Sequence, residues 1–159
     1  MLVFRIASQE YISDLSGLGA RLYGGRWNSP GVALVYTSGS RALALLEVLV
    51  HLPAMMVRND YAIAEILLPD NSSIKKVITS DLPKGWEKFP GPIELQEIGN
   101  NWVRSCESLI LQVPSALVAD EYNYLVNPAH PDAAMISVKK INPFNFNNRL
   151  IENKGKQVN

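Results

Sequence analysis

Residues 24–31 read GGRWNSPG, residues 33–37 read ALVYT and residues 41–52 read RALALLEVLVHL. The glycines and the proline of the first stretch, called here the glycine-rich segment, predict a contorted turn. The second stretch is a short apolar run bounded by turn residues, which is typical of a buried strand. The third predicts a helix that Pro53 closes, for which Ser38 or Ser40 can supply the N-cap oxygen. A turn, a strand and a helix therefore follow one another directly.

The expected helix is apolar on every side, which predicts a buried helix rather than one at the surface. Its carboxylate, Glu47, is costly to bury unless it is paired or used in chemistry. An ion pair with a neighbouring arginine would be a purely structural interpretation. Tyr36 on the preceding strand could lie close to Glu47, although a buried tyrosine is more often a core residue.

Arg26 is the cation of the glycine-rich segment, and Arg5 lies on an expected strand near the N-terminus. A guanidinium on a rigid turn suits bidentate capture of a phosphate or a carboxylate. The alternative interpretation is a structural arginine that ties the turn to a carboxylate. The spacing of these residues leaves both interpretations open.

Outward from this region, residues 82–92 contain three prolines and two glycines and predict an irregular surface loop. Beyond this loop, apolar side chains at spacings of three and four predict one face of a helix that Gly99 and its neighbours weaken: Leu95, Ile98, Trp102 and Cys106. Nearer the C-terminus, a turn is expected at Asn142 and Pro143. Apolar runs predict further strands at residues 3–6, 61–68, 74–78, 108–113 and 134–140.

Early helices and late strands indicate an α+β fold rather than a regular alternation of strands and helices. The length suits a single domain, expected at residues 1–150, with a polar C-terminal tail at residues 151–159. The formal net charge is zero, which argues against nucleic-acid binding. No run of 18 apolar residues occurs, so no membrane span is expected. These features and the single cysteine, Cys106, predict a cytoplasmic protein without an intramolecular disulfide.

Several common motifs are missing. No Gly-Lys-Ser/Thr triplet follows the glycines, and Leu22 stands where a dinucleotide fingerprint requires its third glycine. No Gly-x-Ser-x-Gly elbow surrounds Ser115, so a serine hydrolase is a weak interpretation. His51 and His130 have no cluster of further ligands at metal-binding spacing, so no metal is expected.

Five ordered motifs together carry a resemblance that none carries alone. They are GARLYGGRWNSPG at residues 19–31, YTS at 36–38, ALALLE at 42–47, SLILQVPSALVADEYNYLVNPAHP at 108–131 and PFNFNNRL at 143–150. In this order they resemble the RES domain family, which is named for an arginine, a glutamate and a serine. The resemblance covers nearly the whole chain.

The resemblance implies a split β-sheet core with flanking helices, similar to that of ADP-ribosyltransferase toxins, which grip NAD in a cleft. By position it implies Arg26, Glu47 and Ser115 as catalytic residues. It further implies that Arg5, Tyr36, Arg26 and Ser115 contact NAD+. We therefore expect Arg26 and Glu47 to line one common cavity.

The resemblance also implies the toxin of a bacterial toxin–antitoxin pair, with an Xre-type helix-turn-helix antitoxin as its partner. Members of the family degrade NAD+ by hydrolysis or phosphorolysis, so NAD+ is expected as substrate, inorganic phosphate as a possible co-substrate, and no cofactor. Two alternatives stay open at this point. One is a protein mono-ADP-ribosyltransferase with the same cleft, and the other is a catalytically silent module that binds its partner.

Overall fold

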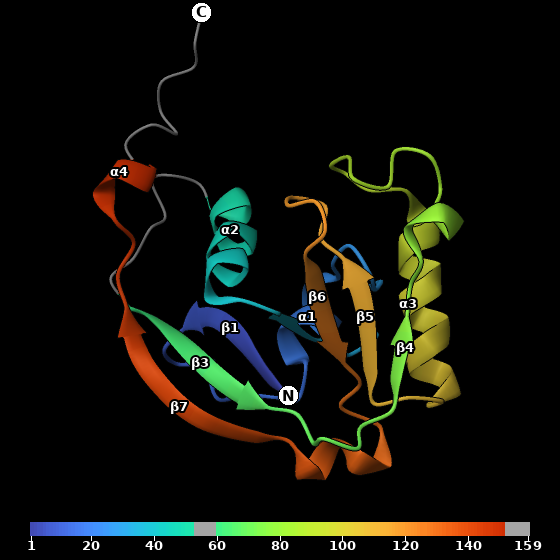
Figure 1. Ribbon diagram of the computed structural model, residues 1–159, viewed down its shortest axis with the longest axis horizontal. Coiled ribbons are helices and arrows are strands. Elements are labelled where there is room, and N and C mark those ends of the chain that lie inside the picture. The colour runs from blue at the N-terminus through green and yellow to red at the C-terminus, as the bar shows by residue number, and fades with distance from the viewer. Residues whose placement is uncertain (53–59, 152–159) are drawn as a thin grey trace, which may run out of the picture.

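The computed structural model describes residues 1–52 and 60–151 (Figure 1). They form a seven-stranded sheet with the order β4-β5-β6-β2-β1-β3-β7. The strands are β1 (Leu2–Ser8), β2 (Val35–Ser38), β3 (Tyr61–Leu67), β4 (Ile74–Lys76), β5 (Ile110–Pro114), β6 (Tyr122–Val126) and β7 (Ser137–Phe144). The α-helices are α1 (Leu18–Tyr23), α2 (Arg41–His51), α3 (Ile93–Ser105) and α4 (Asn148–Ile151), with 3-10 turns η2 (Thr79–Asp81) and η3 (Pro131–Met135).

The sheet is nearly divided between β1 and β2. Strand β1 pairs with β3 from Leu2 to Ser8, whereas its only register pair with β2 joins Phe4 to Ser38. One half of the sheet is therefore β1-β3-β7, and the other is β4-β5-β6-β2. Helix α2 contacts both β1 and β2 at the division, while α3 lies beside the second half (Figure 1). The prediction of an α+β fold with a split sheet is confirmed.

Two details of the strand prediction are wrong. Strand β6, in the middle of the second half, was not expected, because its sequence YNYLV stands among turn residues. The turn expected at Asn142 and Pro143 is instead part of β7, where these residues pair with Ile63 and Ala62 of β3. Strand β7 is an edge strand, and an edge strand tolerates proline because one side of its backbone needs no partner.

Helix α2 begins where one of the two candidate caps predicts. Ser40 is the N-cap, and its Oγ accepts a hydrogen bond from the Leu43 backbone nitrogen at 3.1 Å. The prediction that this helix is buried on every side is wrong, since Leu46 and Val50 are 39% and 52% exposed. Only one face of α2 packs into the core, so apolar residues of the opposite face are left at the surface. The expected stop at Pro53 lies outside the described residues.

Helix α3 docks on the glycine-rich segment through the residues expected to weaken it. Gly99 and Asn100 are buried, and a side chain at Gly99 would overlap the Trp27 carbonyl oxygen. Asn100 Oδ1 accepts a hydrogen bond from the Ser29 backbone nitrogen, and Asn100 Nδ2 donates one to the Ser29 hydroxyl. Glycine here permits close contact between helix and turn. Cys106, expected on the buried face, is instead an exposed C-cap with a left-handed backbone.

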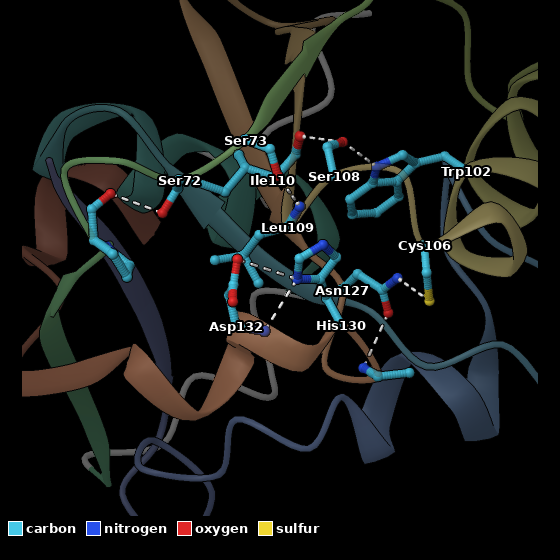
Figure 2. Close-up of polar contacts among 12 residues, drawn as sticks. Ser72, Ser73, Trp102, Cys106, Ser108, Leu109, Ile110, Asn127, His130 and Asp132 are labelled. Carbon is cyan, nitrogen blue, oxygen red and sulfur yellow. Dashed lines mark hydrogen bonds and ion pairs between the residues drawn. The ribbon is translucent and has the colours of Figure 1, made fainter.

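A separate polar cluster fastens the C-terminal end of α3 to the sheet (Figure 2). The fully buried Asn127 donates from Nδ2 to the Val103 carbonyl at 3.1 Å and to Cys106 Sγ at 3.6 Å. Trp102 Nε1 donates to Ser108 Oγ at 2.8 Å. These bonds satisfy buried polar groups, so the cluster has a structural role.

The described part of the chain contains no helix long and apolar enough to cross a membrane. Of the polar tail expected at residues 151–159, Ile151 ends α4 and residues 152–159 lie outside the described residues.

Candidate active site

One cavity brings together four of the five residues named as candidates from the sequence. It has a volume of about 870 Å³, and Arg5, Arg26, Tyr36 and Glu47 line it. Its walls come from β1, β2, α2, the glycine-rich segment and the 82–92 loop, so it lies where the sheet is split. Arg26 and Glu47 thus share a cavity, as expected.

Glu47 is held through one of its two carboxylate oxygens. Asn123 Nδ2 donates to Oε1 at 2.5 Å, and Ser115 Oγ donates to the same oxygen at 3.2 Å. Within residues 1–52 and 60–151, Oε2 receives no hydrogen bond, and no arginine or lysine forms an ion pair with Glu47. The ion-pair interpretation of Glu47 therefore fails for the described residues. A carboxylate oxygen is left available at the cavity.

Ser115 is buried, and its surroundings orient its hydroxyl. Its Oγ accepts hydrogen bonds from the backbone nitrogens of Leu117 at 3.1 Å and Val118 at 3.2 Å. Because these two donors occupy the oxygen lone pairs, the hydroxyl proton is directed to Glu47. The structure therefore brings Ser115 to Glu47. A direct contact between Ser115 and NAD+ stays a prediction.

Arg26 anchors the glycine-rich segment to the 82–92 loop. Its Nη1 donates to the carbonyl oxygens of Trp86 at 2.6 Å and Lys88 at 3.0 Å. The structural interpretation is thus right that Arg26 ties the turn down but wrong about the partner, which is backbone carbonyl rather than carboxylate. Among the described residues, Nε and Nη2 have no partner. These donors can bind an anion in the cavity.

The hydroxyl of Tyr36 holds the glycine-rich segment in place. It donates to Asn28 Oδ1 at 2.7 Å and accepts from the Trp27 backbone nitrogen at 3.1 Å. Asn28 is fully buried, and its Nδ2 donates to the Ala20 and Val32 carbonyls, each at 2.8 Å. Burial raises the pKa of Tyr36 well above its ordinary value. The hydroxyl is therefore structural, while the ring is left to line the cavity.

Arg5 adds a second guanidinium from β1. Its Nη1 donates to the Asp14 carbonyl at 2.5 Å. Burial lowers the pKa of Arg5, and the nearby Asp14 carboxylate opposes this shift. Arginine nevertheless stays protonated at neutral pH. Two guanidinium groups, those of Arg5 and Arg26, and two carboxylates, those of Glu47 and Glu87, therefore line the same cavity.

Sequence reasoning missed the residues that support Glu47. Asn123 lies on the strand that was not predicted, and Ser38 was considered only as a helix cap. Ser38 Oγ donates to Asn123 Oδ1 at 2.7 Å. The YTS and EYNYL stretches contain both residues, but only the pairing of β2 with β6 brings them together.

Two aromatic side chains at the rim of the cavity were also missed. His51 at the end of α2 lies against Phe89 of the 82–92 loop, with ring centroids 5.7 Å apart, and both line the cavity. As for metals, no three His, Cys, Asp or Glu side chains come together as an ion site in the part of the chain that the structure describes.

Comparison with known proteins identifies relatives over most of the chain. The family model described as the RES domain matches residues 2–147. A protein of Sphingobium sp. (strain YBL2) named Prs ADP-ribosylating toxin is 41% identical over 87% of this chain and 87% of its own. A protein of Yersinia enterocolitica named Toxin Res is 38% identical over 92% of this chain and 95% of its own.

A solved structure shares the fold at low sequence identity. One chain in the crystal structure of the M. tuberculosis MbcT–MbcA toxin–antitoxin complex superposes with a TM-score of 0.71 and 16% identity, covering 96% of this chain and 87% of that one. The family model and these relatives cover most of the chain, and the chain belongs to the RES domain family.

Proposed function

We propose that this chain is the toxin of a toxin–antitoxin pair and that it cleaves the nicotinamide–ribose bond of NAD+. One observation carries the proposal: a guanidinium with unused donors and a carboxylate with an unused oxygen, Arg26 and Glu47, line one cavity. The names of two relatives that match most of the chain, Prs ADP-ribosylating toxin and Toxin Res, support the biological role.

In the proposed complex Arg26 and Arg5 bind the pyrophosphate, whose negative charges match their two guanidinium groups. The ring of Tyr36 packs against the nicotinamide. Fixing the dinucleotide at one end orients its reacting ribose toward Glu47, and such orientation by itself can lower the barrier considerably.

The reaction breaks the bond between ribose C1 and the nicotinamide nitrogen. The bonding electron pair leaves with nicotinamide, which departs neutral and so needs no proton. An ordinary glycosidase uses a second carboxylic acid for that proton, and this site has no need of one. The sugar becomes an oxocarbenium ion, which the Glu47 carboxylate stabilises electrostatically.

The acceptor oxygen then bonds to C1. With water, the released proton passes to Glu47 or to solvent, and free ADP-ribose is the product. With inorganic phosphate, the product is ADP-ribose 1″-phosphate. We propose NAD+ glycohydrolase or NAD+ phosphorylase activity on this basis.

A second candidate is mono-ADP-ribosyl transfer to a protein, which the name of the Sphingobium relative favours. Incubating the pure chain with labelled NAD+, with and without phosphate and cell lysate, separates the two. Free ADP-ribose or its 1″-phosphate, identified by mass, supports cleavage with a small acceptor. Label on a protein band supports transfer. A titration that detects no NAD+ binding would overturn both and favour a silent binding module.

We further propose that the partner is an Xre-type helix-turn-helix antitoxin and that the toxin acts in the cytoplasm. Co-expression of the chain with the protein encoded beside it tests the pairing. We expect growth arrest with the chain alone, restored growth with the pair, and a stable complex on size-exclusion chromatography. Continued arrest with the pair would contradict this partner.

A further inference from the structure

We infer that Asn123 is a positioning residue that fixes the Glu47 carboxylate for reaction, and that Ser38 fixes the amide of Asn123. The inference rests on the proposed function. Its basis is a continuous chain of hydrogen bonds, from Ser38 Oγ to Asn123 Oδ1 at 2.7 Å and from Asn123 Nδ2 to Glu47 Oε1 at 2.5 Å.

The chemistry of the three side chains allows one arrangement. An ionised carboxylate only accepts hydrogen bonds, so the Asn123 amide must present its NH2 group to Glu47. The amide oxygen then faces Ser38, whose hydroxyl can donate to it. Each group in the chain therefore sets the orientation of the next.

These hydrogen bonds lie where the two halves of the sheet meet. Ser38 is the residue of β2 whose register partners are Phe4 of β1 on one side and Asn123 of β6 on the other. It thus stands at the single register pair that joins the two halves of the sheet. Glu47 on α2 is therefore linked, through Asn123 and Ser38, to the place where β1, β2 and β6 pair.

The bonds also determine which carboxylate oxygen reacts. Asn123 and Ser115 both donate to Oε1, and two donors in different directions fix the plane of the carboxylate. The second oxygen, Oε2, then has a defined position toward the substrate. Without Asn123 the carboxylate keeps only the longer bond from Ser115 and can rotate, so turnover falls while the binding of NAD+ through Arg26 is unaffected.

The test compares Asn123→Ala, Asn123→Asp and Ser38→Ala with wild type. We expect Asn123→Ala to lower kcat by about 10- to 100-fold, because small misplacement of a catalytic group has effects of this size. The dissociation constant for NAD+ should stay within about twofold. Ser38→Ala should lower kcat less, because the donor to Glu47 is retained. Asn71→Asp, exposed and outside the cavity, is the control for charge.

Asn123→Asp supplies a readout that a merely structural role would not move. Two carboxylates at this separation share a proton, which raises the apparent pKa of the pair. The acidic limb of the kcat profile should therefore move to higher pH in Asn123→Asp and stay in place in Asn123→Ala. The other titratable side chains that line the cavity are common to all variants: Arg5, Tyr23, Arg26, Tyr36, His51 and Glu87.

A carbon-13 NMR titration of the Glu47 carboxyl separates this inference from the proposed function. If wild type cleaves NAD+ but Asn123→Ala retains its kcat, or Asn123→Asp titrates Glu47 as wild type does, the positioning role is overturned. If wild type does not cleave NAD+, the proposed function fails. In that case an upward shift of the Glu47 titration in Asn123→Asp still supports the hydrogen-bonded pair, and an unshifted one overturns it. Thermal melts verify that each variant is folded.

Discussion

The backbone of Gly99 in α3 lies against the carbonyl oxygen of Trp27, so closely that no side chain fits between the helix and the glycine-rich segment. Asn100, the next residue of α3, binds Ser29 of the same segment. The turn that carries Arg26 is therefore held from one side by a helix and from the other by Tyr36. These contacts fix the turn, and a fixed turn holds the Arg26 guanidinium at one position in the cavity.

Gly99→Ala should destabilise the protein, although alanine is the better helix former by about 1 kcal/mol. Its Cβ would overlap Trp27, and overpacking of this kind typically costs about 1–3 kcal/mol or more. Gly19→Ala in α1 is the matched control, since its Cβ would meet nothing within 4 Å. Chemical denaturation should therefore show a lower free energy of unfolding for Gly99→Ala and an unchanged or higher one for Gly19→Ala. Equal free energies of unfolding in the two variants would contradict the close contact.

Glu47→Gln should fold normally and lose NAD+ cleavage. The side chain keeps its shape but cannot stabilise a cationic sugar, so turnover should fall about 10²–10³-fold or more. Nicotinamide release measures it. Glu97→Gln on the exposed surface of α3 is the control and should leave turnover unchanged. Near-normal turnover in Glu47→Gln would exclude the proposed role.

Arg26→Ala should weaken NAD+ binding by about 10- to 100-fold, the range expected when a hydrogen-bonded charged group is removed. It should also lower the free energy of unfolding, because the Trp86 and Lys88 carbonyls lose their donor. Arg26→Lys keeps the positive charge but lacks the planar set of guanidinium donors, so its affinity for NAD+ should lie between those of wild type and Arg26→Ala. Arg21→Ala, exposed and outside the cavity lining, is the control. Unchanged affinity by calorimetry in Arg26→Ala would leave Arg26 with a structural role alone.

Tyr36→Phe should change how stability depends on pH. At neutral pH it leaves the buried Asn28 oxygen and the Trp27 N–H without their partner, at a cost of about 1–3 kcal/mol. Burial raises the folded-state pKa of Tyr36 above the unfolded value of about 10. The unfolded chain therefore loses the phenol proton first, and stability falls as pH rises beyond about 10.

Phenylalanine cannot titrate, so the alkaline loss of stability should be shallower in Tyr36→Phe than in wild type. Burial also raises the pKa of Tyr124, which acts in the same direction in both proteins. Denaturation curves between pH 8 and pH 12 measure the difference, with the exposed Tyr23→Phe as control. Parallel curves for wild type and Tyr36→Phe would show that the Tyr36 hydroxyl is not sequestered as described.

Much of the fold could be read from local pattern. Apolar runs bounded by turn residues marked β1, β2, β3 and β5, and the start of α2 was predicted to within two candidate caps, Ser38 and Ser40. These signals are local because burial of alternating side chains and capping of a helix both depend on near neighbours in the chain. The prediction of a turn at Asn142 and Pro143 was wrong, because proline is tolerated in an edge strand and the position of β7 at the edge is not visible in the local sequence.

The amino-acid sequence by itself determined which residues are available: two guanidinium groups, one carboxylate in an apolar helix, and motifs in the order of a known family. Only the tertiary structure decided their partners. Asn123 reaches Glu47 because β6 pairs with β2, and Arg26 meets carbonyls of a loop about sixty residues away. Hydrogen-bond partners across a sheet follow from strand register, which long-range packing sets and no short stretch of sequence encodes.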